Sequence, residues 1–140
     1  NCFFASMATG TLSKFGSLRS DQLLFLARVS EASERYEDMT QFTATLVKQR
    51  CKASQELTIE ERNLLSVAYK NIVSNIRGSL RRLADEESEE NKFLVNDYRL
   101  YIEKELTAKC VEILKLVEDH LLVQYKDKYD ENMVFYLKMC

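Results

Sequence analysis

The feature that most constrains this sequence is the stretch at residues 58–83, which reads as one long amphipathic helix. No proline interrupts the stretch, and Gly78 is its only glycine. At about 100° per residue, apolar side chains recur along one side and polar side chains along the other. Thr58 can accept a hydrogen bond from a first-turn amide, and Glu61 can reach back to the Thr58 amide. We therefore expect a capped helix that begins at Thr58 and buries one side.

The polar side of this helix carries cations and no acid. Its residues are Asn63, Ser66, Lys70, Ser74, Arg77 and Arg81, and the apolar side holds Leu65, Ala68, Ile72, Ile76, Ser79 and Leu83. Lys70 and Arg77 lie two turns apart, about 10 Å along the axis, so both side chains can bend toward one anion. Arginine offers a planar fork that suits phosphate oxygens, and lysine offers a point charge. On spacing alone, an ordinary solvated face and an anion site both remain open.

The rest of the chain also favours helices. Three glycines and no proline in 140 residues provide little turn chemistry for a β-sheet protein, and 30% of the residues are charged. Apolar periodicity predicts further helices at residues 20–33, 36–51 and 92–123, and the start of another near Met133. Short polar loops between helices favour antiparallel neighbours. We expect an all-α fold of stacked antiparallel helices over residues 17–140, preceded by an extension at residues 1–16 that is either disordered or added in cloning.

Several function classes are disfavoured. A net charge of −2 does not suggest nucleic-acid binding, and no run of eighteen apolar residues predicts a membrane span. Four cysteines without a CxxC pair, with His120 as the only histidine, make a zinc site improbable and fit reduced cysteines in the cytoplasm. No nucleophile–base motif or glycine-rich phosphate loop is present, so we expect no enzyme, no metal and no cofactor.

Residues 62–71, RNLLSVAYKN, resemble the signature of the 14-3-3 family of phosphopeptide-binding adaptors. SERYEDM at residues 33–39 is similar to the family's first interhelical turn, and VFYLKM at residues 134–139 is similar to the start of its fifth helix. The resemblance runs from about Gln22 to the end and covers the N-terminal half of a family member. It implies a cup-shaped dimer whose subunits each have nine helices and one groove. The connection before the long helix is longer than the family pattern by about four residues.

The resemblance also implies a phosphopeptide site. The positions that match the family's binding residues are Lys70, Arg77, Asn63, Ser66, Arg81 and Lys138. Lys70 and Arg77 match the cations that hold the phosphate, whereas the others match polar or basic groove positions. The rest of the family's phosphate clamp, an Arg–Tyr pair in a GDYYRY segment, does not occur in this sequence. We therefore expect this chain alone to bind phosphopeptide weakly or not at all.

A dimer interface is implied in the same way. Its matching positions are Val29, Ser33, Arg35, Asp38, Ser79, Tyr98 and Glu105. Arg35 and Glu105 match one intersubunit ion pair, and Asp38 matches one member of a second pair whose partner position holds Tyr101 instead of lysine. Exposed ion pairs contribute about 0–1 kcal/mol each, so a homo- or heterodimer is still expected, and the lost pair leaves room for an altered or weaker interface. The alternative is that Arg35 and Glu105 are simply solvated and form no intersubunit ion pair.

The sequence thus predicts a phosphoserine- or phosphothreonine-binding adaptor that docks phosphorylated client proteins in a basic groove, incomplete in this chain. The alternative is a helical scaffold that binds partners without phosphate dependence.

Overall fold

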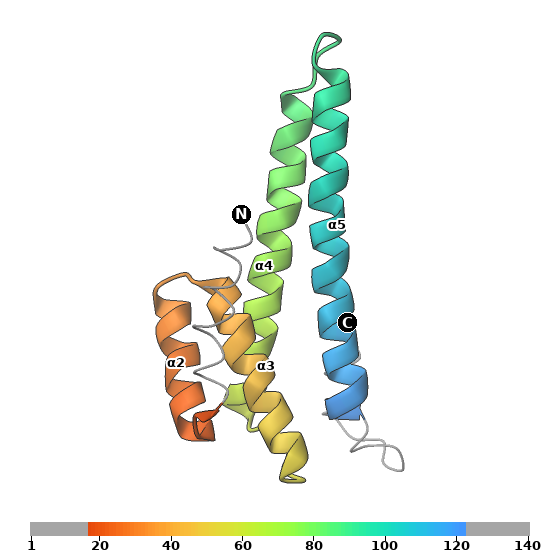
Figure 1. Cartoon of the computed structure of the whole chain (residues 1–140). Helices are drawn as coiled ribbons and strands as arrows, with labels where there is room; N and C mark the ends of the chain where they lie inside the picture. Colours follow the sequence, from red (N-terminus) through yellow and green to blue (C-terminus); the bar gives the residue numbers. More distant parts are fainter. Residues whose placement is uncertain (1–16, 123–140) are drawn as a thin grey trace. The chain divides into compact units, whose positions relative to one another are not determined.

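The computed structural model describes residues 17–122 of the chain. Within that part the secondary structure is helical, with no strand. The elements are α2 (Ser20–Ala32), α3 (Tyr36–Lys52), α4 (Ile59–Asp85), α5 (Lys92–Leu116) and a π-helical turn, η2 (Val117–Leu121) (Figure 1). The predicted all-α fold is therefore confirmed, and the long helix begins directly after Thr58 as expected. The expected helix near Met133 lies outside the described residues.

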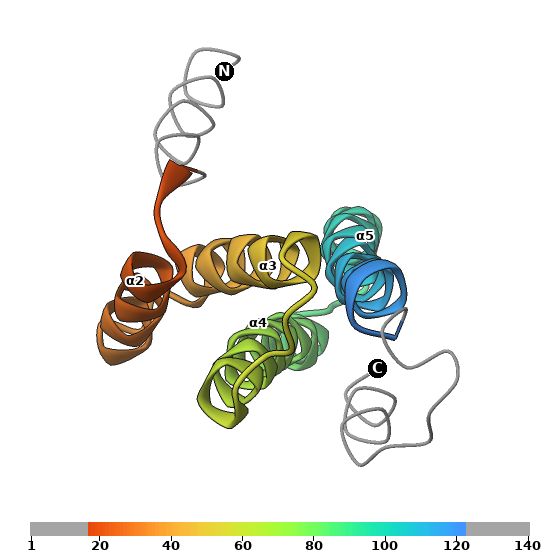
Figure 2. The ribbon, with the colours of Figure 1, turned by 90° about the horizontal axis from the view of Figure 1, so that it is seen from below.

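By its internal contacts the chain divides into two units, residues 1–68 and 69–140, and each is described here by itself. The first unit contains α2, α3 and the first part of α4, and the second contains the rest of α4, α5 and η2. In the first unit, α2 and α3 lie side by side and antiparallel (Figures 1 and 2). In the second unit, α5 runs antiparallel to the later part of α4 (Figure 1).

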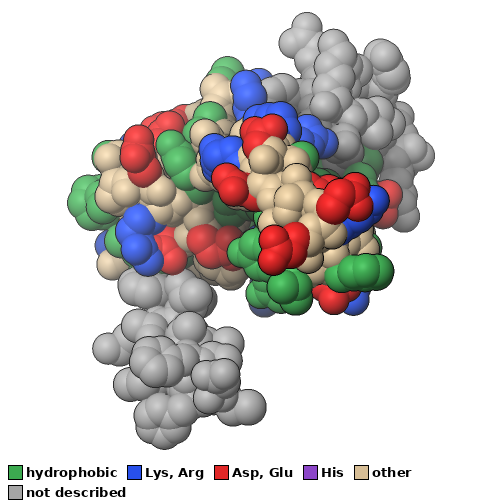
Figure 3. All heavy atoms as spheres, turned by 90° about the horizontal axis from the view of Figure 1, so that it is seen from above, with side chains coloured by type: hydrophobic (Ala, Val, Ile, Leu, Met, Phe, Trp, Pro, Cys, Tyr) green, Lys and Arg blue, Asp and Glu red, His purple; other side chains and the backbone are tan. Residues whose placement is uncertain are grey.

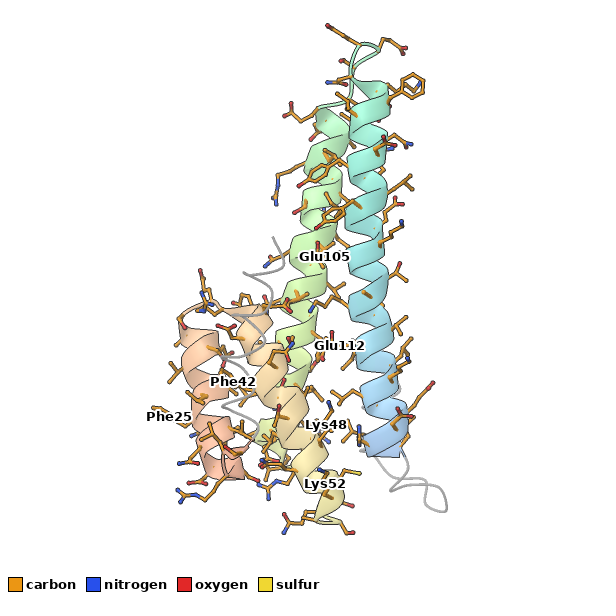
Figure 4. The ribbon with its side chains drawn as sticks, viewed as in Figure 1. Phe25, Phe42, Lys48, Lys52, Glu105 and Glu112 are labelled. Atoms are coloured by element: carbon orange, nitrogen blue, oxygen red, sulfur yellow. The ribbon has the colours of Figure 1, made fainter. Side chains whose placement is uncertain are left out.

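One apolar core holds the first unit together. Its buried members are Leu23, Ala27, Met39, Phe42, Leu46, Leu64 and Ala68. Phe42 lies between α2 and α3, whereas Phe25 projects away from α3 and is 61% exposed (Figure 4). The helices therefore bury one stripe each and leave part of α2 uncovered.

The ends of α2 and α3 are formed without glycine. After α2, the amide of Glu34 donates to the carbonyl of Glu31 at 3.0 Å, and the amide of Arg35 donates to the carbonyl of Ser30 at 2.8 Å. This pair of bonds is a Schellman motif, whose left-handed residue is usually glycine. Here Glu34 takes that conformation, with a φ of 56°. The end of α3 repeats the pattern with Ser54, whose φ is 53°.

The first turn of α4 is tied down by two neighbouring carboxylates. Glu61 and Thr58 form the predicted capping box, with N–O distances of 3.2 and 3.1 Å. Glu61 also accepts from Arg50 of α3 at 2.6 and 3.2 Å, and its side chain is only 1% exposed. Glu60 accepts from Arg28 of α2 at 2.6 Å. The start of α4 is thereby bonded to both preceding helices.

The second unit buries aliphatic side chains of α4, α5 and η2. The buried residues are Ile72, Ile76, Ile102, Ile113, Leu116, Val117 and Leu121. The helix predicted over residues 92–123 is observed as far as the described residues reach, with a change of type near its end, where the α-helix stops at Leu116 and η2 follows. The wider π turn accompanies burial of both Val117 and Leu121, at 0% and 3% exposure. Within residues 17–122, no helix is long and apolar enough to cross a membrane.

Candidate functional site

The predicted basic stripe is present on the part of α4 that belongs to the second unit. Lys70, Arg77 and Arg81 are all exposed, whereas Ile72 and Ile76 on the opposite side are buried. Burial of the aliphatic side fixes the rotation of the helix about its axis, and this rotation turns the three cations to solvent. The two sides expected from the 3.6-residue period are therefore observed.

No carboxylate neutralises this stripe within the described part of the chain. Lys70, Arg77 and Arg81 form no ion pair with any acid among residues 17–122. Glu112, which lies between α4 and α5 (Figure 4), is engaged by other groups. It accepts from the Tyr69 hydroxyl at 2.9 Å and lies 3.6 Å from the Lys109 ammonium. The cations of the stripe are thus available to an external anion.

Two guanidinium groups lie close to the α4 backbone at Gly78. A Cβ at this position would lie 3.7 Å from nitrogens of both Arg81 and Arg82. Arg82 was not a predicted binding residue, yet its charge lies beside that of Arg81. The signal in the sequence is the adjacent arginine pair that follows Gly78 by three and four residues, which places both cations one turn further along the helix.

The other predicted phosphopeptide residues are not all brought together. Asn63 is exposed and Ser66 is half-buried, but both belong to the part of α4 in the first unit. Lys138 lies outside the described residues. The described stripe of the second unit therefore consists of Lys70, Arg77 and Arg81.

The interface positions of the first unit are largely accessible. Val29 is 45% exposed, and the exposed Ser33 hydroxyl donates to the Val29 carbonyl at 2.6 Å. Arg35 donates to Asp38, three residues further on, in a hydrogen-bonded ion pair. Arg35 and Asp38 are therefore already paired within the chain. This pair would have to break before either residue could form the intersubunit pair that the resemblance implies.

In the second unit, an aromatic stack occupies the predicted interface. Tyr98 and Tyr101 stack with ring centroids 6.2 Å apart and an interplanar angle of 9°. Tyr98, one of the predicted interface positions, is 56% exposed. Ser79 is half-buried and donates to the Asn75 carbonyl at 3.1 Å, and Glu105 is exposed on α5 (Figure 4). The stack is a contact that the sequence analysis did not predict.

Comparison with known proteins gives consistent matches. The family model described as 14-3-3 protein matches residues 26–140. The chain is 45% identical over 130 residues to the 14-3-3-like protein G-BOX factor 14 lambda of Arabidopsis thaliana, covering 88% of this chain and 51% of that protein. It is 43% identical to the 14-3-3-like protein D of Nicotiana tabacum, with the same coverage. It is 45% identical to 14-3-3 protein 10 of Solanum lycopersicum, of which it covers 50%. The chain spans about half the length of these relatives.

Proposed function

Because this chain belongs to the 14-3-3 protein family, we propose that it contributes half of an adaptor that docks client proteins phosphorylated on serine or threonine. In this proposal the protein works in the cytoplasm, as a homo- or heterodimer, and does no catalysis. Lys70 and Arg77 hold the phosphate, and Arg81 with Asn63 and Ser66 lines the peptide groove. Lys138 borders the same groove by resemblance.

The observation that supports this proposal is the stripe of exposed cations without an acid partner in the described chain. A cation that already holds a carboxylate has to break that pair before it binds phosphate, and this lowers the net gain. Lys70 and Arg77 avoid this loss. A phosphorylated side chain carries a charge of about −2 and three acceptor oxygens, so it can engage both cations at once.

The strength expected of the half site is low. A hydrogen bond to a charged group contributes about 1.5–3 kcal/mol, so two cations give roughly 3–6 kcal/mol before the free-energy cost of association. Micromolar affinity requires about 8 kcal/mol net. Fluorescence anisotropy of this chain with a phosphoserine peptide and its unphosphorylated twin measures the difference. Submicromolar, phosphate-dependent binding by the 140-residue chain contradicts the estimate.

The proposed roles are tested best in a longer protein that also carries the other half of a family member. Lys70→Glu and Arg77→Glu should each abolish phosphopeptide binding, because each places a negative charge beside the phosphate. Lys115→Glu is a matched control, since Lys115 is an exposed lysine on α5. Circular dichroism checks that helicity is unchanged. Full affinity in both stripe variants removes these residues from the site.

A second candidate is a scaffold that binds partners through apolar surface without phosphate. The observation in its favour is the number of exposed apolar side chains on α5, among them Phe93 at 87% and Leu94 at 75%. Inorganic phosphate separates the two functions. It should compete with a client for the cationic stripe, and it should leave binding through an apolar surface unchanged.

A further inference from the structure

α5 is apolar on more sides than α4 covers. Its exposed large apolar side chains are Phe93, Leu94, Tyr98, Leu100, Tyr101, Val111 and Leu114. A helix that is apolar all round is normally buried all round. Figure 3, which looks from above onto the end with the α4–α5 loop, shows hydrophobic side chains exposed among charged ones. Part of α5 therefore presents surface suited to another helix.

One of these exposed faces lies directly opposite the buried face of α5. At about 100° per residue, Ile102 and Ile113 lie on the side that packs in the second unit. Phe93, Leu100 and Val111 lie about 180° from them, with exposures of 87%, 49% and 41%. We call these three residues, with Asp97 and Lys104 between them, the outer stripe. Because it points away from the buried side, α4 does not reach it.

The outer stripe is separate from the surface assigned above to the family's dimer. Tyr98, Tyr101 and Glu105 lie about 80–140° around the helix axis from Phe93. A contact made by the outer stripe is therefore additional to that dimer. It also leaves Lys70 and Arg77 uncovered, because both belong to α4.

The charges of the outer stripe are arranged symmetrically about its centre. Asp97 precedes Leu100 by three residues and Lys104 follows it by four. Both side chains are exposed, and neither forms an ion pair within residues 17–122. If two copies of α5 lie antiparallel and cross between positions 100 and 101, Asp97 of each copy faces Lys104 of the other.

The same crossing of the two α5 helices also places large side chains opposite small ones. Position 93 of one helix then faces position 108 of the other, so the large Phe93 ring lies over the small Ala108 side chain at each end. The two positions are fifteen residues apart, about 22 Å of helix. Leu100 of each copy lies at the centre, beside the other copy's Leu100. Apolar residues thus occupy the centre and both ends of the contact, and the opposite charges lie between them.

We propose that this protein self-associates through the outer stripe, by antiparallel pairing of α5 with α5 of a second copy. The occupant of the stripe is a copy of the same chain because its charges and its large and small side chains are complementary to themselves. The pairing joins two chains at a surface distinct from the family's dimer interface. It does not depend on phosphopeptide binding.

Charge reversal and mixing test the proposal with the 140-residue chain. Asp97→Lys gives a chain with lysine at both positions, and Lys104→Asp gives a chain with aspartate at both. In each homotypic pair two like-charge contacts replace two opposite-charge contacts, so self-association measured by sedimentation equilibrium should weaken roughly tenfold. An equimolar mixture of the two variants restores both opposite-charge contacts, and it should associate as tightly as the unmodified chain.

Controls distinguish the outer stripe from other surfaces. Glu103→Lys changes an exposed acid of α5 outside the stripe and should leave self-association unchanged. Leu100→Glu should abolish the association that the charge reversals weaken, with helicity verified by circular dichroism. A chain that stays monomeric at high micromolar concentration overturns the proposal. Association that survives both reversals but is lost in Tyr98→Glu also overturns it, because the family's interface then accounts for the dimer.

Discussion

The ion pair between Arg50 and Glu61 should be the most sensitive polar contact of the first unit. Replacing Arg50 by alanine removes the donors at 2.6 and 3.2 Å from the Glu61 carboxylate. The carboxylate keeps only the Thr58 amide, at 3.2 Å. Because its side chain is 1% exposed, water cannot replace the lost bonds without a rearrangement. The variant therefore leaves a buried charge without its counter-ion.

Breaking a buried ion pair by removing one partner destabilises a protein by about 3–5 kcal/mol. We expect Arg50→Ala to fall near the lower end, about 3 kcal/mol, since the hydrogen bond from the Thr58 amide to the Glu61 carboxylate remains. That is a large share of the roughly 5–15 kcal/mol that stabilises a typical domain. Glu61→Gln keeps the shape and the capping bond, so its loss should be smaller, about 1–2 kcal/mol.

Urea unfolding followed by circular dichroism at 222 nm, a standard helix band, measures these differences as shifts of the transition midpoint. Arg28→Ala is the matched control, because it breaks the neighbouring pair with Glu60, in which both side chains are about half exposed. Its effect should be much smaller, since exposed pairs contribute little. Equal midpoints for Arg50→Ala and Arg28→Ala refute the assignment of Glu61 as a buried, ion-paired group.

Three further outcomes are expected. Gly78→Ala should raise the free energy of unfolding by about 0.5–1 kcal/mol in urea unfolding, because the new Cβ meets nothing closer than 3.7 Å and alanine favours a helix interior. Tyr69→Phe should lower it by about 1 kcal/mol in the same assay, since the hydroxyl bond to Glu112 is lost. The hydrogen bond from Arg28 holds the pKa of Glu60 below its ordinary value of 4.5, so this stabilisation is present above that value and is lost as the pH falls through the lower folded pKa. The difference in thermal midpoint between the unmodified chain and Glu60→Gln should therefore shrink over that acidic range.

The long helix and its start could be predicted from the sequence because their signals are local. Thr58 and Glu61 are three residues apart, and the apolar side recurs with the helix period. The second role of Glu61 could not be predicted, because Arg50 is eleven residues away and its approach depends on where α3 ends. That end carries no glycine or proline, and the left-handed conformation of Ser54 leaves no clear sign in the sequence.

The candidate site was predictable to the same extent. The exposure of Lys70, Arg77 and Arg81 follows from the helix period. The period shows which residues share one side of the helix, but it does not show which other parts of the protein lie near that side. The apolar periodicity of residues 92–123 predicted a helix but not its exposed apolar side, because two apolar faces on one helix blur the contrast on which the pattern depends. The roles of the predicted binding and interface residues depend on contacts with other molecules, and they remain predictions.

The two ion-paired carboxylates at the start of α4, Glu60 and Glu61, affect how far the length of the connection before this helix can change. Glu60 and Glu61 fix this end of the helix by bonds to Arg28 and Arg50, which belong to α2 and α3 and not to the connection at residues 53–58. Within the connection, Gln55 accepts from Arg50 at 2.8 Å and the Thr58 amide donates to Glu61 at 3.2 Å. When the length of a flexible loop doubles, the entropic free-energy cost of closing it rises by only about 0.6 kcal/mol. Insertions and deletions in this connection should therefore be tolerated during evolution, and a peptide tag or fluorophore-bearing insert placed there should leave α4 correctly anchored.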